Sequence, residues 1–136
     1  MSVSFFDSNV LIYLASGVTD KALAAEHILA VPGAVVSTQV VNECASVLRR
    51  KYRHDWNAIR DFVDMVAAVA SIRPISFETS RRGLILAERY GFSVWDSMIV
   101  AAAIEADATT LWTEDLHDGL IVDERLRIAN PFSLLP

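Results

Sequence analysis

The sequence predicts an α/β fold in which helices surround a mainly parallel sheet. Short apolar segments typical of strands alternate along the chain with longer helical segments, which is the order of a parallel sheet. The length of 136 residues is that of one domain, so we expect a single domain spanning 1–136. Apolar residues make up 53% of the chain, with only five Gly and four Pro, which excludes a disordered or low-complexity protein.

The first part of the chain contains two expected strands, each followed by helices. Residues 3–6 form an apolar run typical of a buried strand, and Asp7-Ser8-Asn9 ends it with residues that cap helices. Residues 34–37 form the second such run, after the helix breakers Pro32-Gly33. The helices expected in this part are 10–14, 21–30 and 38–53.

The second part continues the alternation. Residues 72–76 are a strand candidate, and Pro74 favours an edge or an end of the sheet. The β-branched and aromatic run 109–113 predicts a fourth strand, and the tail 126–132 can supply a fifth. Helices are expected at 55–70, at 79–90, where Gly91 ends the helix, and at 93–106.

Four carboxylates from distant positions are candidates for a shared site. Asp7 follows the first strand, and Asp115 follows the fourth. Glu43 and Asp96 each lie near the start of a helix. Ligands of such sheets bind outside the carboxyl ends of the strands, so these side chains can converge there. Each also has a purely structural interpretation, as a helix cap, a turn residue or a solvated side chain.

The surroundings of these acids favour chemistry over capping. Glu43 lies on the flank of an apolar helical stripe, and Asp96 begins a helix that is apolar on nearly all sides. Carboxylates gathered in such a place raise one another's pKa unless a cation intervenes. Oxygen ligands of this kind suit Mg²⁺ or Mn²⁺. The single cysteine, Cys44, excludes an internal disulfide and a cysteine-based zinc site.

The charge balance limits the expected partners. The net charge of -5 argues against a protein that coats nucleic acid electrostatically, but local binding stays possible. One short basic stretch is either a solvated helix end or a phosphate-binding site, and it comprises Arg49, Arg50, Lys51 and Arg53. No apolar run reaches the ~18 residues of a membrane span, and the N-terminus lacks an export signal. We therefore expect a cytoplasmic protein with no membrane partner.

Four segments resemble the PIN domain, and their order most resembles the VapC-type ribonuclease toxins of bacterial toxin–antitoxin modules. The resemblance covers essentially the whole chain, and its most specific segment is Tyr90-Gly91-Phe92-Ser93-Val94-Trp95-Asp96. The other segments are Phe6-Asp7-Ser8-Asn9-Val10-Leu11-Ile12-Tyr13, Val41-Asn42-Glu43 and Thr113-Glu114-Asp115-Leu116.

The resemblance implies a three-layer α/β/α sandwich and a Mg²⁺-dependent endoribonuclease, with Mn²⁺ as a substitute. Family roles fall on an acidic metal cluster and on two supporting residues; these are Asp7, Glu43, Asp96 and Asp115, supported by Asn9 and Thr113. Glu114 and Asp118 depart from the family pattern by adding acids beside Asp115, so three acids at this place are candidates for the metal ligand. The implied partners are RNA and a small antitoxin, and the high apolar fraction suggests a homodimer.

Three alternatives stay open at this point. A catalytically silent PIN-like scaffold that binds a partner protein would keep the fold without cleavage. A phosphatase of the aspartyl-phosphate type would also place an acid after the first strand, but such enzymes have Asp-x-Asp where this chain has Asn9. A structural acid cluster without function is the third alternative.

Overall fold

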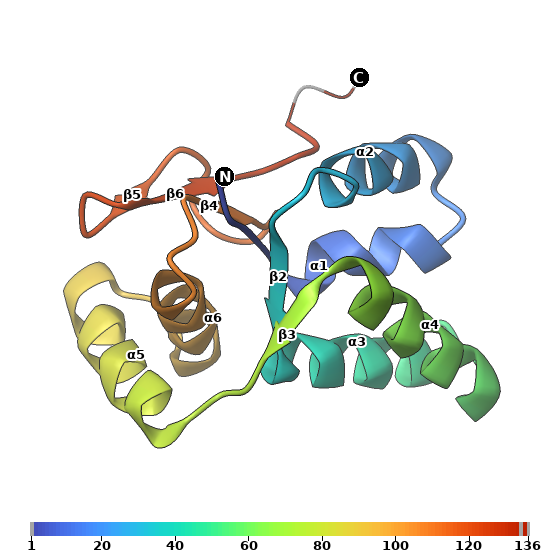
Figure 1. Ribbon diagram of the computed structural model, residues 1–136, viewed down its shortest axis with the longest axis horizontal. Helices are drawn as coiled ribbons and strands as arrows, with labels where there is room; N and C mark the ends of the chain where they lie inside the picture. Colours follow the sequence, from blue (N-terminus) through green and yellow to red (C-terminus); the bar gives the residue numbers. More distant parts are fainter. Residues whose placement is uncertain (1, 134, 136) are drawn as a thin grey trace.

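The structure, a computed structural model, describes residues 2–133 and 135 (Figure 1). The strands are β1 (Ser4–Phe6), β2 (Ala34–Ser37), β3 (Ser71–Arg73), β4 (Thr110–Trp112), β5 (Ile121–Val122) and β6 (Leu126–Ala129). The helices are α1 (Ser8–Leu11), the 3-10 helix η1 (Ile12–Ala15), α2 (Thr19–Leu29), α3 (Thr38–Arg50), α4 (Trp56–Val69), α5 (Phe77–Tyr90) and α6 (Val94–Glu105).

The strands form one sheet in the order β3-β2-β1-β4-β6-β5. Every pair is parallel except β5 with β6. Helices α5 and α6 lie on one side of the sheet, and α1 to α4 lie on the other (Figure 1). This arrangement confirms the predicted α/β sandwich with a mainly parallel sheet.

The centre of the sheet is a point where the strand order reverses. From β1 the chain continues to β2 on one side, whereas β4 pairs with the other side of β1. Phe6 is in register with Trp112, the last residue of β4. Asp7 and Thr113, which directly follow the two strands, are therefore neighbours. In open α/β sheets, ligands bind at the carboxyl ends of the strands at such a point.

The core positions the start of α6 rigidly. Residues 97–104 of this helix are all buried, because the sheet covers one side and α5 covers the other. Gly83 of α5 allows this close packing, since an added Cβ would lie 2.8 Å from Met98 Sδ. The helix is therefore enclosed on most sides, as its apolar sequence predicts, and Asp96 lies in its first turn.

Several predicted boundaries are wrong. The helix expected to reach Arg53 ends at Arg50, and Arg53 has a φ of 56°, which no α-helix accommodates. The strand expected at 72–76 covers Ser71–Arg73 at the sheet edge. Helix α5 begins at Phe77 because Ser76 and Thr79 form a reciprocal capping box. The two-residue strand β5 was not predicted.

The helices of the described chain are too short or too polar to cross a lipid bilayer.

Candidate active site

Asp7 is the most deeply placed acid of the candidate site. Asp7 directly follows β1, caps α1 and is only 5% exposed. The Ser8 backbone N–H donates to its Oδ1 (2.7 Å), and the Thr113 hydroxyl donates to its Oδ2 (2.9 Å). Burial nevertheless raises the pKa of Asp7 to about 6, because desolvation outweighs these hydrogen bonds.

Thr113 and Asn9 connect Asp7 to the end of β4. The fully buried Thr113 hydroxyl accepts from the Asn9 side-chain amide (3.1 Å) and from the Asp115 backbone N–H (3.3 Å). The carbonyl of the Asn9 side chain accepts from the Glu114 backbone N–H (3.2 Å). Two neighbouring strand ends are thus joined by side chains that orient the Asp7 carboxylate.

Replacing Thr113 with valine is expected to lower the free energy of unfolding by about 1–3 kcal/mol. Valine keeps the shape of threonine but has no hydroxyl. The buried Asp7 oxygen then loses its donor, and the Asn9 amide and the Asp115 N–H lose their acceptor. Urea unfolding measures the change, and Thr113→Ser, which keeps the hydroxyl, is the matched control. Equal urea midpoints for the valine and serine variants would show that this hydroxyl does not hold the two strand ends together.

Glu43 and Asp96 approach Asp7 from two facing helices. The Gln39 side chain of α3 donates to the Trp95 carbonyl at the start of α6 (3.1 Å), which holds the two helices in place. Burial raises the pKa of Glu43, and the charge of Asp96 raises it further. The charges of Glu43 and Asp96 also raise the pKa of Asp7. The three carboxylates therefore share one electrostatic environment, although they come from three distant parts of the sequence.

The Asp96 carboxylate does not form the capping-box hydrogen bond that the sequence pattern around Ser93 suggests. The Ser93 hydroxyl accepts from the Asp96 backbone N–H (3.1 Å), which is the first half of a capping box. The contacts of the described residues give the Asp96 carboxylate itself no hydrogen bond in return. The serine alone caps α6, so the acid is available to a ligand.

The donor set of this cluster fits a hard divalent cation. Asp7, Glu43 and Asp96 form no ion pair with any described Lys or Arg, so their mutual repulsion is uncompensated. The described residues contain no group of three acidic, His or Cys side chains already arranged as a metal cage. The acids thus offer oxygen ligands of the right chemistry, without preformed coordination.

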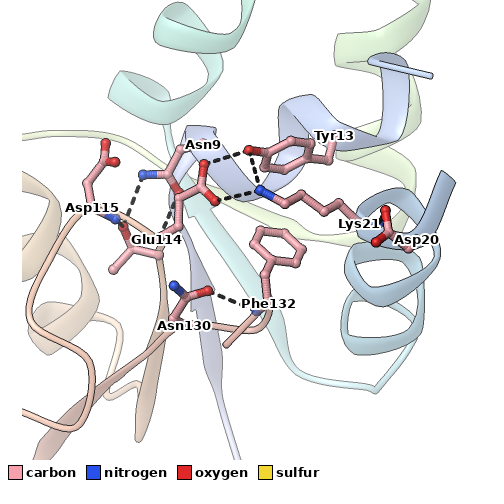
Figure 2. Close-up of polar contacts among 9 residues, drawn as sticks. Asn9, Tyr13, Asp20, Lys21, Glu114, Asp115, Asn130 and Phe132 are labelled. Carbon is pink, nitrogen blue, oxygen red and sulfur yellow. Dashed lines mark hydrogen bonds and ion pairs between the residues drawn. The ribbon is translucent and has the colours of Figure 1, made fainter. Parts of the chain in front are cut away.

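The acids after β4 differ in their surroundings. Figure 2 shows the Glu114 carboxylate directed toward Tyr13 and Lys21, whereas the Asp115 carboxylate points away from them. The Tyr13 hydroxyl donates to Glu114 at 2.7 Å, and Lys21 Nζ lies 3.5 Å from it. Asp118 accepts from the Asn130 backbone N–H (2.9 Å). Glu114 and Asp118 are therefore occupied elsewhere. Asp115 is exposed and contacts Thr113 through its backbone N–H, and no contact of the described residues brings its carboxylate to the other acids.

Lys21 and Tyr13 are site neighbours that the sequence analysis missed. Lys21 lies over the rings of Tyr13 and Phe132, at 4.6 and 5.3 Å from their centroids. It thereby neutralises the extra acid Glu114 beside the candidate site (Figure 2). The two partners are 93 positions apart, so no spacing within the sequence indicates the pair.

The basic stretch divides between two environments. Arg50 lines the same surface groove as Glu43 and Trp95. Arg49 lies over the Trp56 ring (4.6 Å) and donates to the His54 carbonyl. Lys51 contacts Tyr52. The structure therefore brings one member of the stretch, Arg50, into the neighbourhood of the acids.

Cys44 lies beside the acids but has the wrong properties for a nucleophile. Burial raises the pKa of its thiol to about 12, and the charges of Asp7 and Glu43 add to the effect. The thiol stays protonated near neutral pH, and the thiolate is the reactive form. Its burial and raised pKa make Cys44 a packing residue of α3 rather than a candidate nucleophile.

Comparison with solved structures identifies the same fold in several toxin–antitoxin proteins. A toxin–antitoxin complex from Klebsiella pneumoniae is similar with a TM-score of 0.70 at 24% identity, over 94% of this chain and 97% of that one. The sarcin–ricin loop cleaving toxin VapC20 of Mycobacterium tuberculosis gives a TM-score of 0.65 at 16% identity, covering 82% and 89%. VapBC2 from Rickettsia felis, bound to a promoter DNA fragment, gives 0.64 at 19%, covering 94% and 98%.

Comparison of the sequence with models of protein families identifies the family of the chain. No curated protein sequence matches the chain significantly. The model of the PIN domain matches residues 4–117, which extends from β1 through Glu114 and Asp115 after β4. This stretch contains the strand order reversal, the buried Asp7 and the two helices that carry Glu43 and Asp96. The chain therefore belongs to the PIN domain family.

Proposed function

We propose that this chain is a metal-dependent endoribonuclease, the toxin of a VapC-type toxin–antitoxin module. The observation that carries the proposal is the buried Asp7 beside Glu43 and Asp96, with no basic side chain of the described chain paired to any of them. The fold shared with VapC20, a toxin that cleaves the sarcin–ricin loop, supports RNA as the substrate class.

In this proposal Asp7, Glu43, Asp96 and Asp115 hold Mg²⁺, or Mn²⁺ in its place. A bound divalent cation supplies Lewis acidity that activates water and stabilises charge on the phosphate. Asn9 and Thr113 orient Asp7 through the hydrogen bonds that join the ends of β1 and β4. Arg50, assisted by Arg49, Lys51 and Arg53, binds the RNA backbone, since guanidinium groups pair well with phosphate.

Cleavage of RNA by the purified chain tests the proposal. We expect cleavage in Mg²⁺, none after chelation by EDTA, and recovery when Mg²⁺ or Mn²⁺ is restored. Mass spectrometry of the products is expected to show 5′-phosphate and 3′-hydroxyl ends, because water rather than the ribose attacks. A folded chain that leaves all RNA intact in every metal would favour the alternative of a catalytically silent scaffold that binds a partner protein.

The proposed partners are a small antitoxin and a second copy of this chain in a cytoplasmic complex. Two of the solved structures with this fold contain both toxin and antitoxin. The acidic site would attract an antitoxin Arg or Lys side chain. Exposed apolar Phe77, Leu84 and Ile85 on α5 support a homodimer. Light scattering tests this, because a species of 15.0 kDa at micromolar concentration would contradict the dimer.

A further inference from the structure

A surface groove of about 930 Å³ begins beside the acidic site. Helix α3 forms one wall, and the start of α6 forms the other, where α6 carries Asp96 in its first turn. Glu43 lines the groove at the acidic end. A ligand that reaches the carboxylates can therefore continue into this groove.

The α3 wall presents polar side chains that end in a cation. Glu43, Ser46 and Arg50 are spaced by three and four residues, so they lie on one face of the helix. The helical rise places Arg50 about 10 Å along the axis from Glu43. The described contacts give Arg50 no ion pair and no aromatic ring, whereas Arg49 beside it lies over the Trp56 ring. The guanidinium is therefore free to bind an anion beyond the acids.

The α6 wall presents an aromatic ring. Trp95 is 70% exposed although it lies beside Asp96, and its backbone is held by the hydrogen bond from Gln39. Asn42 lines the facing wall and offers both an amide donor and a carbonyl acceptor. An exposed indole opposite such a group provides a stacking surface and a polar edge for a planar heterocycle.

We propose that this groove binds an unpaired stretch of RNA, with one base stacked on Trp95 and a backbone phosphate on Arg50. The inference rests on the proposed function, because it places the scissile phosphate at the acids and continues the same strand along the groove. A cation at the end of the α3 wall and an exposed ring on the α6 wall are the two features by which proteins bind single-stranded nucleic acid, so they favour RNA over an apolar protein segment. Stacking on Trp95 requires a base that is not inside a duplex. Trp95 is then a determinant of which RNA position is cut.

Binding measured with an inactive chain tests the groove without cleavage. In the Asp7→Asn background, a labelled single-stranded oligoribonucleotide is expected to bind about five- to a hundredfold more weakly after Trp95→Leu, the range of one stacked base. Trp95→Phe, which keeps a ring, is expected to retain most of the affinity. Ile121→Ala is the control, because Ile121 is an apolar side chain that is 57% exposed and lies on β5 outside the groove.

Abasic oligoribonucleotides locate the stacked base. One abasic position is expected to weaken binding by the chain with Trp95, and to add no further loss in the Trp95→Leu chain. Arg50→Met is expected to reduce the slope of log affinity against log salt by about 0.7, the contribution of one phosphate contact on a single strand.

Two results would overturn the inference. One is a Trp95→Leu chain that binds RNA as the parent does, with the same abasic penalties. The other is a Trp95→Leu chain that loses its dimer with RNA affinity unchanged, which would assign the groove to a protein contact. Cleavage separates the two proposals: an active wild-type chain indifferent to Trp95 contradicts only the groove, and Trp95-dependent binding without any cleavage contradicts only the nuclease.

Discussion

Replacing Asp7 with asparagine is expected to stop RNA cleavage and to make the folded chain more stable near pH 7. Asparagine keeps the shape of the side chain but removes the charge that a cation requires. The same charge is costly in the folded state, because Asp7 is buried and lies near Glu43 and Asp96. Loss of activity would thus accompany a gain in stability, the opposite of damage to the fold.

Proton linkage explains why this substitution is expected to raise the free energy of unfolding near pH 7. Asp7 has a pKa of about 6 in the folded chain against 3.8 ordinarily, so between these values the folded state binds more protons than the unfolded state. The free energy of unfolding therefore falls as pH rises through this window, by about 3 kcal/mol at most. The amide would lose about 1 kcal/mol of hydrogen bonding at Thr113, whose oxygen already accepts from two donors. We expect a net gain of roughly 1–2 kcal/mol near pH 7.

Urea unfolding in EDTA, at about pH 7 and at about pH 3.5, measures this effect. The advantage of Asp7→Asn should vanish at the lower pH, where Asp7 is mostly protonated in both states, and the lost hydrogen bonding should leave the variant slightly less stable than the parent. Asp64→Asn is the control, because Asp64 is an exposed acid of α4 that forms no ion pair with a described residue. Full cleavage by Asp7→Asn at matched Mg²⁺ concentration would remove Asp7 from the mechanism.

The sequence predicts the layers and the position of the site because both depend on local signals. Short β-branched runs between helices specify a parallel sheet, and such sheets place the residues after each parallel strand at one edge. Asp7 and Thr113 are neighbours for this reason. Ser93, three residues before Asp96, identified the first turn of α6. The assignment of Asp7 and Asp96 to metal binding and catalysis rests on family resemblance and stays a prediction.

The missed features depend on tertiary contacts or on backbone conformations that the sequence does not signal. A strand as short as β5 has no periodicity, and it exists because it pairs with β6. Arg53, which the sequence placed inside α3, has a left-handed backbone conformation beyond the end of the helix, yet arginine has no preference for that conformation. The pair of Lys21 with Glu114 forms only when α2 lies against the end of β4.

Mn²⁺ binding is expected to weaken by about tenfold for each pH unit below pH 6, since the cation must displace the proton of Asp7. Calorimetric or paramagnetic-resonance titration of the full chain from about pH 5 to about pH 8 measures this profile. The bend of the profile should lie near the pKa of Asp7, well above the ordinary pKa of an aspartate.

The variants Glu43→Gln and Asp96→Asn are expected to change two properties of this profile, the affinity at high pH and the pH of the bend. Each replaces a charged carboxylate with a neutral amide, which is a weaker ligand for a divalent cation, so affinity at high pH should fall by about tenfold or more. Each also removes a charge that raises the pKa of Asp7, so the bend should move to lower pH. Asp118→Asn should change neither, because Asp118 is held by the Asn130 backbone. An unmoved bend would contradict a cluster shared by Asp7, Glu43 and Asp96, since only their mutual repulsion links a distant substitution to the proton on Asp7.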